Sequence, residues 1–103
     1  MSDRARSVWR SVDVAAVNGN TVRLRTMQDF TAGWHSHDES DELFFVLSGL
    51  FHLDTDQRTV DVRAGELFVV PAGVRHRGRA DVPTTLLVID CIRGDAQSVG
   101  HSV

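Results

Sequence analysis

Three histidines and one glutamate are spaced so that they could bind a single metal ion. His35 and His37 are two residues apart, and in a β-strand such residues point to the same face. Glu42 opens the apolar run that follows, and His76 comes after a Pro-Ala-Gly turn. Each of them alone would be an ordinary surface or core residue, so only the four together suggest a site.

The donor atoms of this candidate site are nitrogen and oxygen, without sulfur. Such a set suits iron, manganese, zinc, nickel, cobalt or copper, whereas calcium and magnesium prefer oxygen ligands alone. Four protein ligands leave positions open for water, substrate or O₂ on a metal that accepts five or six. We therefore expect one divalent transition metal ion as the cofactor.

The composition of the 103-residue chain excludes several other kinds of chemistry. All 11 basic residues are Arg, so a lysine Schiff base is impossible, and the lack of Tyr removes a tyrosyl acid or base. A net charge of −3 argues against nucleic acid as a partner. The single cysteine excludes an internal disulfide, and no apolar run approaches the length of a membrane span. We expect a cytoplasmic protein without a membrane partner, and beyond the candidate ligands the catalytic residues are unknown.

Short alternating or apolar segments, separated by turn residues, must position these side chains. The expected strands are 11–17, 21–27, 31–37, 42–47, 50–55, 58–62, 67–70, 74–79 and 84–93. No segment has helical periodicity long enough for a structural helix, which favours an all-β sandwich or barrel. One domain is expected over residues 8–93, between a flexible segment at 1–7 and a polar tail at 94–103.

Four residues mark turns between these strands. Gly49, Gly65 and Gly73 are expected to adopt a positive φ or to permit close approach of another backbone. Pro71 and Gly73 fit the second and fourth positions of a type I turn.

The candidate ligands and turns together resemble the two sequence motifs of the cupin superfamily. The first motif runs from a His-x-His pair through a glutamate to a glycine, and the second from a glycine through Pro-x-Gly to a histidine. The matching positions are His35, His37, Glu42 and Gly49, then Gly65, Pro71, Gly73 and His76. The sequence looks like the short single-domain cupins that are called mannose-6-phosphate isomerase-like by similarity only.

This resemblance implies a double-stranded β-helix, the cupin jelly-roll barrel, with His35, His37, Glu42 and His76 as metal ligands. Asp29 stands where the first motif opens with glycine, and Ala80 stands where the second closes with asparagine. Both are structural positions, so the ligand set is unaffected.

Four apolar residues are expected to line the pocket of such a barrel and to give the metal a dry wall. They are Phe44, Val46, Phe68 and Val70.

Other polar residues are weaker candidates for a role in the site. Arg23 and Arg25 share one face and could bind an anionic substrate if that face looked inward, but such pairs are usually solvated. The arginines beside His76 alternate with it and should face outward. His52 is expected at the surface or behind the ligands, outside the ligand set.

Two segments, 43–47 and 86–89, are apolar on both faces, so their outer faces need a cover. A second copy of the chain is the simplest cover, and we expect a homodimer.

Three functions are compatible with these residues. We favour a metal-dependent enzyme acting on a small organic molecule, with dioxygenase-type chemistry, because no general base is visible beyond the ligands. The alternatives are a non-catalytic ligand- or metal-binding module, such as a sensor or auxiliary domain, and a sugar isomerase-type cupin. Fold and ligands alone do not choose among them.

Overall fold

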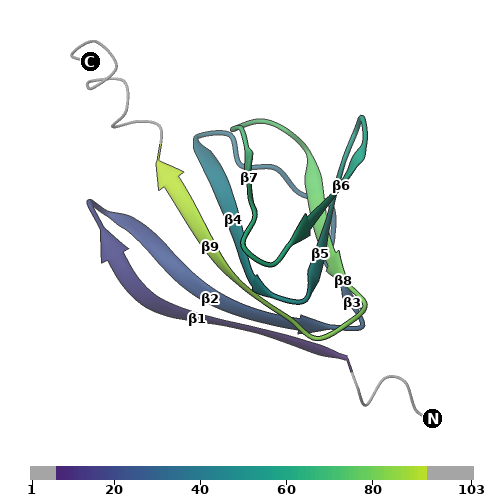
Figure 1. Cartoon of the computed structure of the whole chain (residues 1–103). Coiled ribbons are helices and arrows are strands. Elements are labelled where there is room, and N and C mark those ends of the chain that lie inside the picture. The colour runs from purple at the N-terminus through teal and green to yellow at the C-terminus, as the bar shows by residue number, and fades with distance from the viewer. Residues whose placement is uncertain (1–6, 93–103) are drawn as a thin grey trace.

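The structure is a computed structural model that describes residues 7–92, and within them the chain forms nine β-strands and no helix (Figure 1). The strands are β1 (Val8–Val17), β2 (Asn20–Gln28), β3 (Phe30–Thr31), β4 (Ser40–Ser48), β5 (Leu50–Thr55), β6 (Thr59–Arg63), β7 (Leu67–Val70), β8 (His76–Ala80) and β9 (Thr84–Ile92). The all-β expectation is thus confirmed. Residues 1–6 and 93–103, which include most of the two expected end segments, lie outside the described range.

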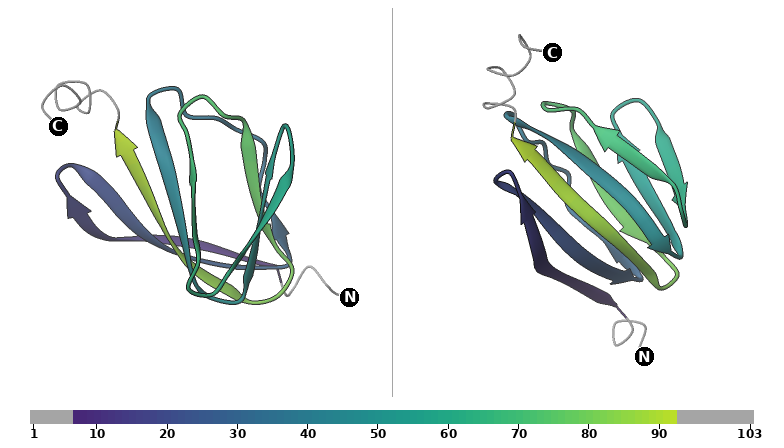
Figure 2. Two further views of the ribbon diagram at one scale, coloured as in Figure 1. Left: turned by 45° about the horizontal axis from the view of Figure 1, so that its top comes forward. Right: turned by 60° about the vertical axis from the view of Figure 1, so that its left-hand side comes forward.

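The strands form two antiparallel sheets that face each other (Figure 2). The larger sheet has the order β1-β2-β9-β4-β7, and the smaller sheet has the order β3-β8-β5-β6. The chain crosses repeatedly between the sheets, as in a jelly roll, while the β1–β2 hairpin extends to one side (Figure 1). Asn18 and Gly19, with φ of 50° and 81°, close this hairpin in the conformation that Asn-Gly favours. In the described part of the chain, no helix has the length and hydrophobicity to span a bilayer.

The core lies between the two sheets and is built from the alternate residues that point inward. Its buried members are Met27, Phe44, Val46, Phe51, Leu53, Val62, Val70, Ala80, Leu86 and Val88. Phe51 fills the space above Gly78, where an added Cβ would lie 2.5 Å from the tip of the ring. Any side chain at position 78 would therefore displace this phenyl ring.

The turn glycines have the backbone conformations expected of them. Gly49, Gly65 and Gly73 have φ of 91°, 85° and 86°. The expected type I turn is wrong, because the turn begins one residue later than predicted: the Val74 amide donates to the Pro71 carbonyl (3.2 Å). Pro71 is thus the first residue of the turn and Gly73 the third, and a positive φ at the third position is typical of type II.

The strand expected over 31–37 is the main local difference from the sequence prediction. Only Phe30–Thr31 forms a strand, and residues 32–39 form a loop in which His35 makes an isolated bridge to His76. Asp29, at the position of the missing motif glycine, has φ of 49°, a left-handed conformation that Asp tolerates. The chain thus keeps the bend without the glycine.

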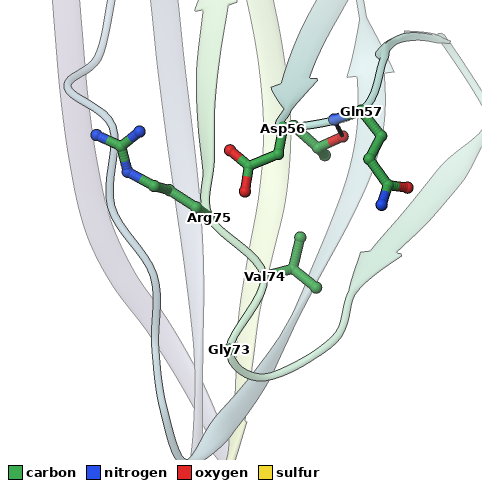
Figure 3. Close-up of a pocket in the computed structure, with 6 residues that line it drawn as sticks. Asp56, Gln57, Gly73, Val74 and Arg75 are labelled. Carbon is green, nitrogen blue, oxygen red and sulfur yellow. Dashed lines mark hydrogen bonds between the residues drawn. The ribbon is translucent and has the colours of Figure 1, made fainter.

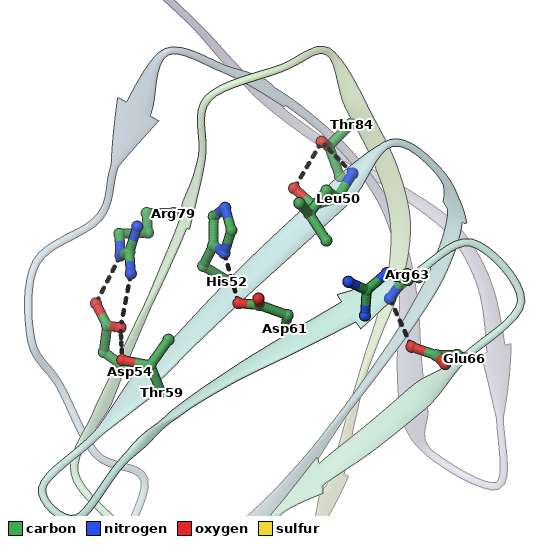
Figure 4. A network of polar contacts seen from close by, with 9 residues as sticks. All are labelled: Leu50, His52, Asp54, Thr59, Asp61, Arg63, Glu66, Arg79 and Thr84. Atoms are coloured by element: carbon green, nitrogen blue, oxygen red, sulfur yellow. Dashed lines mark hydrogen bonds and ion pairs between the residues drawn. The ribbon is translucent and has the colours of Figure 1, made fainter.

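The outer face of the smaller sheet carries a network of polar contacts centred on Asp54 of β5 (Figure 4). The Asp54 carboxylate accepts hydrogen bonds from Thr59 Oγ1 (2.7 Å), Arg77 Nε (2.8 Å) and Arg79 Nε (2.9 Å). The hydrogen bond from Arg79 is the largest cause of the lowered pKa of this buried carboxyl. Asp54 therefore joins β5, β6 and β8 through one charge.

Asp54→Asn is expected to lower the free energy of unfolding at neutral pH by about 1–2 kcal/mol, since charge-assisted hydrogen bonds are lost and the arginines are partly screened by solvent. A lowered folded-state pKa stabilises the protein above the unfolded pKa of about 3.9, and this contribution is lost as the pH falls through the folded value. The variant should therefore lose less stability between about pH 4 and pH 2 than the wild type. Denaturant unfolding across this range measures both effects. Asp56→Asn, which removes an exposed carboxylate in the β5–β6 turn, is the control with a much smaller expected effect.

Candidate metal centre

The four candidate ligands come from three segments that meet at one end of the barrel. His35 and His37 lie in the loop 32–39, Glu42 lies near the start of β4, and His76 is the first residue of β8. One donor atom from each residue lies within 4.8 Å of those of the other three. The ring centroids of His35 and His76 are 4.4 Å apart, and those of His35 and His37 are 5.0 Å apart.

Backbone hydrogen bonds hold this loop against the rest of the barrel. The amides of His35 and His76 each donate to the carbonyl of the other residue, at 2.9 and 2.8 Å. The Gly73 amide donates to the His37 carbonyl at 2.8 Å, so the Pro-Ala-Gly turn fixes the second histidine of the pair. Glu42 reaches the cluster from the inner face of β4, where its residue is only 5% exposed.

Two of the imidazoles are oriented by backbone carbonyls. His35 Nδ1 donates to the Gly33 carbonyl and His76 Nδ1 donates to the Val74 carbonyl, each at 2.9 Å. A proton held on Nδ1 leaves Nε2 of His35 as the atom that can bind a metal, and Nε2 of His76 can bind one once it has given up its own proton. Metal-binding histidines are commonly fixed in this way by a second hydrogen bond.

Glu42 and His76 form a buried pair within the cluster. His76 Nε2 donates to Glu42 Oε1 at 2.9 Å. Burial by itself would lower the pKa of His76, but the hydrogen bonds to Glu42 and Val74 outweigh it, and the pKa lies above its ordinary value. Burial likewise opposes ionisation of Glu42, but hydrogen bonds with His76 and Asp90, together with nearby imidazoles, bring the pKa of this carboxyl below its ordinary value. The site therefore favours a negative carboxylate facing imidazole nitrogens.

The cluster fits a transition metal ion. Metal–nitrogen and metal–oxygen bonds of about 2.0–2.2 Å place donors on opposite sides of an ion about 4 Å apart, so small side-chain shifts would suffice here. His37 Nε2 is buried and has no hydrogen-bond partner among the described residues, and it lies 3.5 Å from Glu42 Oε1. A bound cation would use this nitrogen and would shield the carboxylate.

The apolar residues expected to line the pocket all lie on the inner face of the larger sheet. Phe44 is buried beside the cluster, with its ring edge-on to His76 at a centroid distance of 6.1 Å. Val46 and Val70 are buried in the core, and Phe68 is partly buried against it.

The polar candidates are divided between the two faces of the barrel. His52 lies on the outer face of the smaller sheet, where its Nδ1 is 2.7 Å from Asp61 Oδ1, away from the cluster. Arg75 and Arg77 face outward as expected, with their guanidinium groups 5.1 and 5.0 Å from the centre of the Trp34 ring.

Arg23 and Arg25 differ from the expectation that they are solvated. Arg23 pairs across the sheet with Val88, and Arg25 pairs with Leu86; both of these partners are buried in the core. Since cross-strand partners share a face, both arginines are on the inner face. An anionic substrate could therefore meet cations on this inner face.

Comparison with known proteins agrees with this geometry. The family model "Cupin domain" matches residues 23–90, which include all four candidate ligands. This chain is a cupin. Cupins commonly bind a metal, and the His/Glu cluster of this cupin could hold one.

This cupin is similar to several proteins over most of its length. It is 38% identical over 93 residues to "Uncharacterized protein YdbB" of Bacillus subtilis (strain 168), covering 87% of this chain and 80% of that protein. A cupin-2 domain containing protein from Shewanella frigidimarina superposes with a TM-score of 0.77 at 23% identity, covering 88% of this chain and 93% of the other. KdgF from Halomonas sp. superposes with a TM-score of 0.73 at 18% identity, covering 90% and 94%. At these identities the two structures show a shared fold.

A separate pocket of about 240 Å³ lies between the β5–β6 turn and the loop before β8 (Figure 3). It is lined by Thr55, Asp56, Gln57, Gly73, Val74 and Arg75. None of the four clustered residues lines it. Val74, which does line it, accepts a hydrogen bond from His76 Nδ1 through its carbonyl. This pocket was not foreseen from the sequence, because it joins two turns that are distant along the chain.

Proposed function

We propose that this cupin binds one divalent transition metal ion through His35, His37, Glu42 and His76. The observation that supports this most is the buried, unpartnered Nε2 of His37 beside a buried carboxylate and two imidazoles whose Nδ1 atoms are already tied to carbonyls. The ligand set resembles that of the cupin motifs, and the convergence within 4.8 Å is what such a set requires.

We further propose that the protein is a metal-dependent enzyme acting on a small organic molecule, with dioxygenase-type chemistry. A bound redox-active ion would supply Lewis-acid or O₂ chemistry, and four protein ligands leave it open positions. The protein's own contribution is to fix the three imidazoles and to keep Glu42 charged. The apolar side chains on the inner face of the larger sheet, of which Phe44 lies beside the cluster, would exclude water. The chain offers no lysine or tyrosine base, which favours chemistry at the ion itself.

The test is to load the protein with Fe(II) or Mn(II) and to add small aromatic acids and keto acids. We expect the spectrum of the metal to change, since the ligand would enter an open position, and we expect O₂ uptake with at least one compound. Glu42→Gln should alter this spectral change, because it removes one charge at nearly constant shape. Ligand binding without turnover would favour the sensor, and turnover of a sugar phosphate without O₂ uptake would favour the isomerase-type cupin. A metal that contacts no added ligand would contradict the enzyme proposal.

The proposed assembly is a homodimer formed by the outer face of the larger sheet. Cross-strand pairing aligns one apolar residue from each of its five strands in a single row. The row consists of Val12, Leu24, Leu87, Phe45 and Leu67. Leu67 is 56% exposed and Val12 is 48% exposed in the single chain. A second copy could cover such a row with its own, because an apolar face needs no charge complement.

We expect the wild-type protein at micromolar concentration to have twice the 11.4 kDa mass of one chain by light scattering. Leu67→Glu should give the monomer mass, since it buries a charge only if the outer faces meet, and Phe45→Glu should split or unfold the protein. Gln57→Glu adds the same charge at an exposed turn and should leave the dimer intact. A monomeric wild type, or a Leu67→Glu protein that is folded and dimeric, would show that this face is not the interface.

A further inference from the structure

Arg25 of β2 is an inward-facing cation that the metal cluster does not use. Its cross-strand neighbours on the same face are Leu86 of β9 and Ser11 of β1. Its guanidinium carbon lies 5.2 Å from the centre of the Trp9 ring, so the first strand covers it from one side. Burial is the largest influence on its pKa, which is below the ordinary value, and the Glu42 carboxylate is near enough to oppose this effect.

Two buried polar atoms at this position have no hydrogen-bond partner among the described residues. They are Arg25 Nε and the Ser11 hydroxyl oxygen, which belong to directly paired residues of β2 and β1. A buried polar group left without a partner costs about 1–3 kcal/mol. Two such groups side by side, one of them part of a cation, indicate a place where a polar ligand group could bind.

Of the two arginines on this inner face, Arg25 is the one without an ion-pair partner among the described residues. Arg23, two residues earlier, donates to the Asp90 carboxylate and also pairs with Asp13 at 3.3 Å. Glu42 and Asp90 are the carboxylates near enough to act on Arg25, but Glu42 is engaged by His76 Nε2 and Asp90 by Arg23. In the described part of the chain, no carboxylate within ion-pair distance of the Arg25 guanidinium is present.

We propose that Arg25, with the Ser11 hydroxyl, binds the carboxylate of a small organic acid with an apolar body. A guanidinium and one hydroxyl match the two oxygens of a carboxylate, while the neighbouring Trp9 ring, which is 46% exposed, offers apolar contact. The proposal rests on the proposed enzyme function, for which it names the substrate class. It requires no metal for the anchoring contact itself, because Arg25 and Ser11 are not among the four ligands.

The test compares carboxylates with their neutral amides on metal-free protein by isothermal titration calorimetry. The probes are benzoate, phenylacetate and hexanoate, each against benzamide, phenylacetamide and hexanamide. At least one acid should bind about 10- to 100-fold more tightly than its amide, the range expected for charge-assisted hydrogen bonds. Arg25→Gln should remove this preference and leave amide binding unchanged, and Ser11→Ala should weaken acid binding to a smaller extent.

Arg63→Gln, the same change at an exposed arginine of β6, is the matched control and should keep the preference. Arg25→Lys keeps the charge and should retain part of the preference for acids over amides. This variant therefore separates lost binding from lost folding. The proposal is overturned if no acid binds better than its amide, or if folded Arg25→Gln binds the acids as the wild type does. Cobalt(II) stoichiometry measured on the same proteins tests the metal site independently, so failure of one proposal is distinguishable from failure of the other.

Discussion

His76→Ala is expected to abolish stoichiometric metal binding. The substitution removes a ligand whose position is fixed by β8 and by its hydrogen bond to the Val74 carbonyl. Loss of a residue that merely supports a ligand costs roughly 10- to 100-fold in metal affinity, so loss of the ligand itself should cost more. Elemental analysis of protein dialysed against a known metal concentration measures the effect. His35→Ala and His37→Ala should act in the same direction.

His52→Ala is the matched control, because His52 lies on the outer face and pairs with Asp61. It should leave metal occupancy unchanged. Full occupancy in folded His76→Ala would contradict the assignment of all four ligands. If folding of this variant is in doubt, His76→Gln keeps the shape and should show the same loss.

The pH dependence of metal binding follows from the same residues. A metal must displace the Nε2 proton of His76, and the raised pKa of this imidazole means that the proton is held to a higher pH than usual. Metal affinity should therefore weaken as the pH falls, and the weakening should begin above about 6.5, the ordinary pKa of a free imidazole.

Gly49→Ala is expected to lower the free energy of unfolding by about 3 kcal/mol or more. Gly49 has a φ of 91°, and an added Cβ would lie 2.5 Å from Thr84 Oγ1 and 2.7 Å from Thr84 Cα. The Thr84 hydroxyl accepts from the Leu50 amide and donates to the Leu50 carbonyl, both at 3.1 Å. A methyl group here would break the link between the starts of β5 and β9 as well as straining the turn.

Gly65→Ala is the control that separates these two causes. Gly65 has nearly the same φ, 85°, but an added Cβ would meet no atom within 4 Å. Its cost should therefore be the backbone strain alone, about 1–2 kcal/mol. Denaturant unfolding of both variants measures the difference, and equal losses would show that the Thr84 contact is not important.

The motif spacing was sufficient to predict which residues meet at the candidate site. It did not predict the local backbone structure around His35 and His37. The prediction placed His35 and His37 on one strand, but only His35 makes a bridge and the segment 32–39 is a loop. The partner that shapes this loop is His76, a residue far away in the sequence. Hydrogen bonds between such distant segments are not visible in a local pattern of alternation.

The orientation of β2 shows a second limit of the sequence prediction. Val22 and Leu24 alternate with Arg23 and Arg25, and the usual rule places the apolar residues inside. The register instead places the arginines inside, on the face of Leu86 and Val88. Alternation separates the two faces of a strand but does not say which face meets the core. In β2 both faces have apolar cross-strand neighbours, Leu86 and Val88 on the inner face and Leu87 on the outer face.

The paired backbone hydrogen bonds between His35 and His76 have a consequence for how a metal would enter. They join the loop to β8 without any contribution from an ion, so the donors are preorganised before binding. Little conformational entropy then has to be lost on metal binding, in contrast to small zinc domains that fold only around their ion. An ion could thus be exchanged for another while the barrel stays folded, and the metal supply of the cell would determine which one occupies the site.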